Sequence, residues 1–189
     1  MAAWEIAKNV GGDTEWKGQL SADAAQINLG ATSGDSAISQ AYDHLYLVVS
    51  PREGNSNYYV DLEFRFNDDS SPYSNTNFWA SAAAENSNRT ASNEVGDVIS
   101  TCASNGIVSN GFGFNSLWIA NYSGSGFKQC LMEGFAPNMS ATDSQWRIMY
   151  SAGLFAETGP IKKIRIQGAG GPEFMANTSW VLYGITGAS

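Results

Sequence analysis

The chain has 189 residues, of which 43% are hydrophobic and 15% are charged, and its formal net charge is −8. A chain of this length can bury most of its unfolded surface, so we expect one domain whose core needs no disulfide or metal ion. The acidic charge argues against a nucleic-acid partner, because binding to phosphates needs clustered Lys and Arg, and it disfavours contact with an anionic membrane surface.

Short β-strands are expected first near residues 4–7 and 25–29. Residues 45–49 form a continuous run of leucine, tyrosine and valine, which is typical of a strand buried on both faces. Residues 58–66 are predicted as the next strand, and the intervening segment 51–57 is rich in turn-forming residues. The two strands are therefore expected to pair as an antiparallel hairpin.

The strand predicted at 58–66 has the clearest pattern in the sequence, because apolar and charged side chains alternate along it. The apolar positions are Val60, Leu62, Phe64 and Phe66, and the charged positions are Asp61, Glu63 and Arg65. Successive side chains point to opposite faces of a strand, so the apolar set is expected in the core and the charged set in water.

From residue 67 to about residue 115 the composition shifts to Asn, Ser, Gly and Asp. A structureless loop of this length is unusual in a compact domain, so we expect a long polar insertion, partly ordered, that folds over one sheet and supplies contacts with partners. The alanine-rich segment 80–85 is expected to form at most a turn or two of helix, since Ala is the best helix former.

The second half of the chain contains further predicted strands at 116–120, 127–134, 145–152, 161–167 and 180–185. A glycine-rich connection indicates that the last two of these are paired. A basic cluster in the first of that pair is expected to be a solvated face and an edge protected by lysine; it consists of Lys162, Lys163 and Arg165.

Short strands separated by turn-rich loops indicate an all-β fold. We predict a single antiparallel β-sandwich that is jelly-roll-like. Residues 1–14 are expected to be an N-terminal arm, and residues 15–189 are expected to form the sandwich with its insertion at about 67–115.

The segment from residue 160 onward carries a distinctive pattern. An aliphatic residue precedes Ile164 and Ile166, and a glycine-rich turn, Phe174 and a Ser-x-x-Leu-Tyr-Gly-Ile motif at 179–185 follow. Three further segments match the same pattern in the same order: 42–49 followed by Arg52, 62–69 followed by Tyr73, and 112–123. This ordered set covers roughly residues 15–187 and resembles small structural proteins of tailed bacteriophages, many of them from aquatic phages.

The resemblance implies a non-enzymatic virion protein on the particle exterior, as capsid decoration or cement or as a tail or baseplate component, with a β-sandwich or jelly-roll fold. Its partners would be other virion proteins and other copies of itself, with a trimer preferred, and no cofactor is implied. The alternative is a receptor- or carbohydrate-binding module of the phage tail that recognises a host surface glycan. A small glycan-degrading enzyme is the third hypothesis.

Residues 1–5 have neither the basic nor the apolar region of a signal peptide, and no run approaches the ~18 apolar residues of a membrane span. We therefore expect a protein that is made in the host cytoplasm, is not inserted into a membrane and is located in the virion. Cys102 and Cys130 are expected to be free thiols, because two cysteines so far apart form neither a disulfide scaffold nor a CxxC zinc site.

The candidate catalytic residues have ordinary structural interpretations. His44 lies at the entry to a strand, with no Gly-x-Ser-x-Gly motif in the chain, and is expected to hydrogen-bond a loop. Asp61 and Glu63 share a strand face, but Arg65 shares it too, so a solvated charged face is expected rather than the carboxylate pair of a glycosidase.

A possible cation site lies at residues 67–69, where Asn67, Asp68 and Asp69 offer oxygen ligands of the kind that calcium prefers. Their spacing differs from the Asp-x-Asp-x-Asp-Gly loop, and Asn and Asp are ordinary turn formers. No metal site is predicted, and cation binding by Asp68 and Asp69 stays open.

Six tryptophans and eight tyrosines invite a carbohydrate-binding hypothesis. Tyr58, Tyr73 and Trp79 fall at loop or strand ends, so they are the candidate residues for binding a sugar or a protein partner. The tryptophans that lie within predicted strands are expected in the core; these are Trp118, Trp146 and Trp180.

Overall fold

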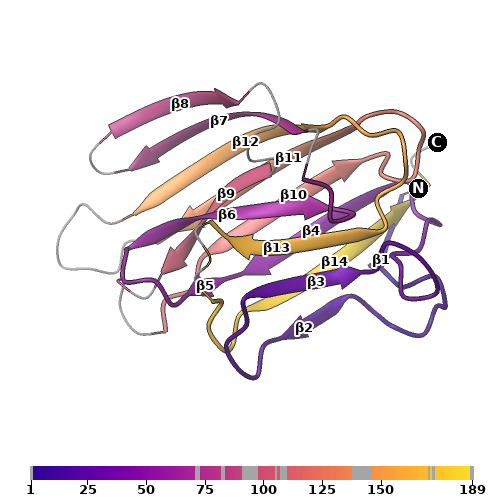
Figure 1. The fold of residues 1–189 in the computed structure, drawn as a ribbon, viewed down its shortest axis with the longest axis horizontal. Coiled ribbons are helices and arrows are strands. Elements are labelled where there is room, and N and C mark those ends of the chain that lie inside the picture. Colours follow the sequence, from indigo (N-terminus) through magenta and orange to yellow (C-terminus); the bar gives the residue numbers. More distant parts are fainter. Residues whose placement is uncertain are drawn as a thin grey trace.

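The computed structural model describes residues 2–70, 73–81, 84–90, 98–104, 106, 110–137, 146–169, 171 and 173–187. Within these residues there is no helix, and fourteen β-strands form two packed sheets (Figure 1). The prediction of an all-β, antiparallel sandwich is confirmed. Its closer description as jelly-roll-like stays a prediction.

The larger sheet has nine strands. Their spatial order is β1 (Ala3–Ile6), β14 (Ser179–Thr186), β4 (His44–Ser50), β10 (Phe114–Ala120), β11 (Lys128–Ala136), β12 (Arg147–Phe155), β7 (Tyr73–Ser81) and β8 (Ala84–Thr90). The ninth strand, β2 (Lys17–Gln19), pairs with β14 on the same edge as β1. All pairings in this sheet are antiparallel.

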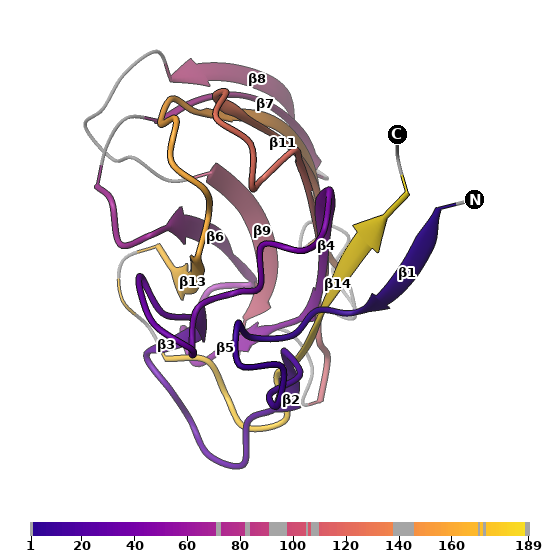
Figure 2. The same cartoon turned by 90° about the vertical axis from the view of Figure 1, so that its right-hand side faces the viewer.

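The smaller sheet has five strands. Their order is β3 (Gln26–Gly30), β13 (Lys163–Gly168), β6 (Tyr59–Phe66), β9 (Val98–Ser104) and β5 (Arg52–Glu53). Only the short β5–β9 pairing among these is parallel. Figure 2 shows the two layers nearly edge-on, with β3, β13 and β6 in one and β4 and β14 in the other.

The core fills the space between the two sheets. Its central side chains are fully buried and come from both layers: Leu45, Leu47, Leu117, Ile119 and Leu182 from the larger sheet, and Leu62, Phe64, Phe66, Ile164 and Ile166 from the smaller one. Each such side chain contributes about 1.5–3 kcal/mol when it is removed from water. The alternation predicted for β6 is thus confirmed on its apolar face.

The two predicted strand pairings are both wrong. β4 lies in the larger sheet and β6 in the smaller one, and β13 and β14 are separated in the same way. The chain crosses between layers after Ser50 and again after Gly168. Because both layers present apolar side chains to one core, the sequence pattern of a strand does not show to which sheet it belongs.

β4 also differs from the expectation of burial on both faces. Leu45, Leu47 and Val49 point into the core, whereas Tyr46 and Val48 lie half-buried on the outer face of the larger sheet. That outer face is therefore apolar although it is not covered by a third layer of described residues.

The predicted insertion at 67–115 is wrong as well. This range supplies β7 and β8 to the larger sheet and β9 to the smaller one, so it is an integral part of the sandwich. The helical turn predicted at 80–85 does not form, because β7 continues to Ser81 and β8 begins at Ala84. Residues 107 and 108, two apolar residues of this range, lie outside the described residues.

Residues 1–14, predicted as an arm, contain β1, which pairs with β14. The same segment is tied to the sandwich by isolated bridges between Lys8 and Glu15 and between Asn9 and Ile38.

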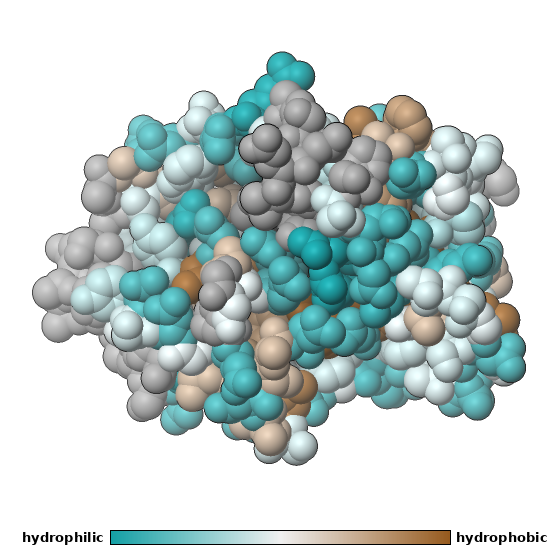
Figure 3. Space-filling model, in the orientation of Figure 1, coloured by the Kyte–Doolittle hydropathy of each residue, from teal (hydrophilic) through white to brown (hydrophobic). Residues whose placement is uncertain are grey.

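The basic cluster on β13 is not at a sheet edge, because β13 lies between β3 and β6. Lys163 Nζ lies 2.8 Å from Asp68 Oδ2, and Arg165 Nη1 lies 3.8 Å from Asp68 Oδ1. The outer face of the smaller sheet, seen from the front in Figure 3, is largely hydrophilic. Two of the three basic residues of the cluster, Lys163 and Arg165, are thus paired with a carboxylate of the chain itself.

A buried lysine holds the turn that leads into β11. The side chain of Lys128 is fully buried, and its ammonium group donates to the carbonyl oxygens of Gly124 at 2.6 Å, Gly126 at 2.5 Å and Thr158 at 3.5 Å. The three carbonyls belong to two loops that are distant in sequence, so one cation fastens both.

We predict that Lys128→Met lowers the free energy of unfolding by about 1–3 kcal/mol, because it leaves buried carbonyls without a donor. Chemical denaturation followed by tryptophan fluorescence measures the change. The control is Lys17→Met, since Lys17 is exposed and its ammonium group pairs with Glu15 at the surface, and its effect should stay within about 0.5 kcal/mol. Equal stability of the two variants would contradict the role of Lys128.

Candidate binding surface

The structure does not bring the three predicted ligand-binding aromatics together. Tyr73 is 3% exposed, its hydroxyl accepts from the Phe66 N–H at 2.8 Å, and its ring stacks on Phe155 at 4.9 Å. Tyr73 is therefore a core residue, and the expectation that its ring is exposed is wrong. The strand β7 begins at this residue and directs it inward.

Tyr58 and Trp79 lie nearer the surface, but in different environments. Tyr58 is 43% exposed just before β6. Trp79 is half-buried, and the Arg147 guanidinium lies 5.1 Å from its ring centre and 5.0 Å from that of Tyr59. The Trp79 ring thus packs on a cation of its own chain.

The candidate catalytic residues each have a structural partner. His44 Nδ1 accepts from the Asn121 N–H at 3.0 Å, as predicted for a histidine that hydrogen-bonds a loop. Asp61 pairs with Arg147 at 2.7 Å. Glu63 accepts from the Gln167 amide at 2.7 Å and is only 8% exposed, so its predicted exposure to water is wrong.

At residues 67–69, where the sequence left cation binding open, the Asp68 carboxylate forms ion pairs with Lys163 and Arg165. Asn67 and Asp68 both have positive φ angles, 54° and 63°, as expected of a tight turn built from Asn and Asp. Among the residues that the structure describes, no group of three His, Cys, Asp or Glu side chains is placed to hold a metal ion. Cys102 and Cys130 are free and buried.

None of the described segments forms a helix that is long and apolar enough to span a membrane.

The notable surface is the outer face of the larger sheet. Six of the large apolar side chains on it are more than one-third exposed: Trp4, Phe78, Phe114, Leu131, Phe135 and Tyr150. Strand register places them on one face, since paired residues such as Trp118 and Leu131, or Tyr150 and Phe78, lie side by side across neighbouring strands. These side chains make much of this face apolar, in contrast to the hydrophilic outer face of the smaller sheet.

Sequence reasoning missed this face because Trp118 was expected in the core. Leu117 and Ile119 occupy the core side of β10, so the alternation of the strand turns Trp118 outward. Both faces of β10 carry large apolar side chains, and such a pattern does not show which face is covered. Of the other two tryptophans assigned to the core, Trp180 packs against it and Trp146 is partly exposed.

Four rings meet at one end of this face and form what we call the aromatic cluster: Trp4, Tyr46, Trp118 and Tyr183. The Trp4 ring centre lies 5.7 Å from that of Tyr46, 6.2 Å from that of Trp118 and 6.3 Å from that of Tyr183. These are ordinary spacings for aromatic pairs, so the rings support one another. Trp4 remains 55% exposed.

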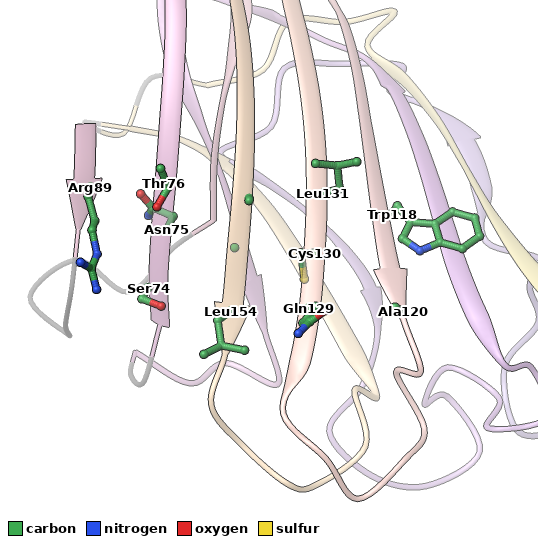
Figure 4. A pocket seen from close by; sticks show the side chains of 12 residues that line it. Ser74, Asn75, Thr76, Arg89, Trp118, Ala120, Gln129, Cys130, Leu131 and Leu154 are labelled. Atoms are coloured by element: carbon green, nitrogen blue, oxygen red, sulfur yellow. The ribbon is translucent and has the colours of Figure 1, made fainter. Parts of the chain in front are cut away.

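Beside the aromatic cluster, the same face is hollowed by a depression of about 790 Å³ that extends across β10, β11, β12, β7 and β8 (Figure 4). Small residues form its floor, and Trp118 and Arg89 lie at its opposite ends. Its polar side chains include Ser74, Thr76 and Gln129. The arrangement offers a place for a ligand but no converging pair of acid and base.

Comparison with models of protein families, with curated proteins and with solved structures found no match to this chain.

A separate feature of the interior is the carboxyl group of Glu53. This side chain is fully buried, and the backbone of Gly168 leaves it room, since a Cβ atom there would overlap with its carboxylate. Burial, with added repulsion from Glu63 and Asp61, raises the pKa of Glu53 from 4.5 to about 8, although the neighbouring Cys102 thiol opposes the shift. Glu53 is therefore protonated in the folded protein at neutral pH.

We predict that the free energy of unfolding falls as the pH rises from about 4.5 to about 8. In this range the folded state keeps the Glu53 proton, whereas the unfolded state releases it. Glu53→Gln should remove this dependence and should make the protein more stable than the wild type above pH 8 by up to about 5 kcal/mol, since one unit of pKa shift corresponds to about 1.4 kcal/mol. Urea denaturation at several pH values measures both effects. Glu85→Gln, on the exposed strand β8, is the control and should keep the wild-type slope; an unchanged slope in Glu53→Gln would contradict the assignment.

Proposed function

We propose that this protein is a non-enzymatic structural component of a bacteriophage virion, on the exterior of the capsid or in the tail or baseplate. It acts by binding neighbouring virion proteins, including copies of itself, through the aromatic cluster. The sequence resemblance supports the assignment to a phage particle. The exposed aromatic cluster supports the proposal that the protein acts by binding its neighbours.

The aromatic cluster has the properties of a protein interface. Trp and Tyr are enriched at the centres of interfaces, where a few such residues carry most of the binding energy. Isolated proteins rarely expose contiguous apolar patches of this kind without a function for them. A Trp4 ring that is 55% exposed, and that is held by three neighbouring rings, is already arranged for contact before a partner arrives.

The position of Trp4 adds to this argument. It lies on β1, which stands at one end of the strand order of the larger sheet. A neighbour that covers the aromatic cluster would also reach the backbone of this outermost strand, whose polar groups are available for pairing. Several identical copies arranged around one axis would bury the same patch on each, and a trimer is the arrangement that we favour.

A non-enzymatic role is also supported by the partners of the candidate catalytic groups. Asp61 is neutralised by Arg147, Glu63 is hydrogen-bonded to Gln167, and His44 accepts from the Asn121 backbone. These contacts fix side chains within the fold. They do not direct an acid and a base toward one substrate atom, as general acid–base catalysis requires.

We predict that the wild-type protein forms trimers and that Trp4→Ala weakens their association by about tenfold or more, as expected for an aromatic residue at the centre of an interface. Sedimentation equilibrium over a range of concentrations measures the change. Phe127→Ala is the matched control, because Phe127 is 57% exposed but precedes β11 outside the sheet, and it should assemble as the wild type does. A wild-type protein that stays monomeric, or a Trp4→Ala variant of unchanged mass, would contradict assembly through this cluster.

We further predict that gold-labelled antibodies against the folded protein decorate the exterior of intact phage particles in electron micrographs. Particles lacking the gene product provide the control. Protein found in infected cells but absent from purified particles would overturn the virion assignment.

A receptor- or carbohydrate-binding module of a phage tail is the second candidate function. The depression beside the aromatic cluster is the observation that favours it.

A further inference from the structure

We propose that the depression on the outer face of the larger sheet binds an acidic oligosaccharide. The proposal deepens the second candidate function. It depends on the depression, which shares Trp118 with the aromatic cluster but does not include Trp4.

The shape of the depression suits a small ligand. Its volume of about 790 Å³ lies within the range of about 300–1,000 Å³ that is usual for ligand sites. Its lining includes the small residues Ala120, Ala152 and Gly153, and it also includes the large side chains of Trp118, Leu131 and Leu154. The hollow thus results from small residues placed between large ones on neighbouring strands.

Trp118 supplies a surface on which a sugar ring can lie. A pyranose has one apolar face of C–H bonds and an edge of hydroxyl groups, so it packs against an aromatic ring while its edge stays free to hydrogen-bond. The Trp118 ring is partly exposed and is steadied by Tyr46 at 6.2 Å and His44 at 5.3 Å. A preordered ring loses little entropy when a ligand binds.

Polar side chains in the depression match the hydroxyl edge of a saccharide. Ser74 and Thr76 come from β7, and Gln129 comes from β11, so donors and acceptors are spread over several strands. An apolar protein segment in the same place would remove these groups from water without giving them partners, which costs free energy. The lining therefore favours a hydroxyl-rich ligand over an apolar peptide.

Arg89 indicates that the ligand carries an acidic group. It is the single charged residue among the twelve that line the depression, all of which the structure describes, and it stands in a chain of net charge −8. A guanidinium binds a carboxylate through two parallel, charge-assisted hydrogen bonds, which are stronger than its hydrogen bonds to the neutral hydroxyl groups of a sugar. A carboxylate-bearing sugar unit is the group that this end of the depression would select.

The distance between the two ends requires an oligosaccharide. Trp118 lies on β10 and Arg89 on β8, and β11, β12 and β7 lie between them. Four strand spacings correspond to about 19 Å, which is longer than one sugar unit. The chain of sugars would cross the strands, with one unit on Trp118 and an acidic unit at Arg89.

The test is binding of glycans to the purified protein, first on an array of uronic-acid and sialic-acid oligosaccharides with their neutral counterparts, and then by calorimetry. The calorimetric pair is tetragalacturonate and its fully methyl-esterified form, which keep the same sugar units and linkages and differ chiefly in charge. We expect acidic glycans to bind and neutral ones to bind at least about tenfold more weakly, with affinity for the acidic glycan falling as salt is added. Absence of binding to every acidic glycan, or equal binding of neutral counterparts, would overturn the proposal.

Variants separate this site from the assembly surface. Arg89→Gln, an exposed position on β8, should weaken binding of the acidic glycan by about tenfold or more while the sedimentation mass stays that of the wild type. Lys17→Gln removes an exposed positive charge on β2, outside the depression, and should bind as the wild type does. Equal loss in both variants would show a general charge effect and would refute the site.

Trp118→Ala should abolish binding and Trp118→Phe should restore part of it, because phenylalanine keeps a flat apolar ring. Trp4→Ala serves as the comparison, because it should lose assembly and keep glycan binding. Glycan binding that persists in Trp118→Ala would refute the proposed sugar platform. The thermal unfolding temperature of each variant confirms that the fold is retained.

Discussion

The structure depends on one apolar layer between two sheets. β4, β10 and β14 contribute aliphatic side chains from one side, and β6 and β13 contribute aromatic and aliphatic side chains from the other. Since every strand of this core places alternate residues into the same layer, the remaining residues are forced to the two outer faces. The properties of those faces, hydrophilic on the smaller sheet and aromatic on the larger one, follow from this division.

The two outer faces have different physical requirements. On the smaller sheet, Lys163 and Arg165 neutralise Asp68, and the face is stable in water by itself. On the larger sheet, the aromatic cluster and the neighbouring apolar residues leave surface that is costly to hydrate. This asymmetry points recognition toward the larger sheet, where a neighbouring protein and a glycan would occupy adjoining parts of the same face that meet at Trp118.

The sequence predicts strands better than their arrangement. Alternation in β6 and β13 identifies the residues of the core because one phase of each strand is apolar and the other is charged. Pairing between β4 and β6 could not be excluded from sequence, since a turn-rich segment suits a hairpin as well as a crossing between layers. The polar segment that contains β7 and β8 was misread because its strands are rich in Asn and Ser, which have low strand propensity, and pairing with β12 overrides that preference.

The same limit applies to the site. Tyr73 and Trp79 were chosen for their position at element ends, but the face on which a side chain lies depends on which neighbouring residues enter the core. Trp118 and Arg89 come from β10 and β8, which share a sheet but have β11, β12 and β7 between them, and no local spacing in the sequence links the two residues. Their juxtaposition is a property of tertiary structure.

The place of β14 has a consequence for how the larger sheet closes. This strand lies between β4 on one side and β1 and β2 on the other, so β1 and β2 are held in the sheet by a strand that is distant from them in sequence. Such long-range pairing is slow in comparison with local pairing. Trp4 and Tyr183 meet only when this pairing has formed, so the aromatic cluster is completed together with this edge of the sheet and not before it.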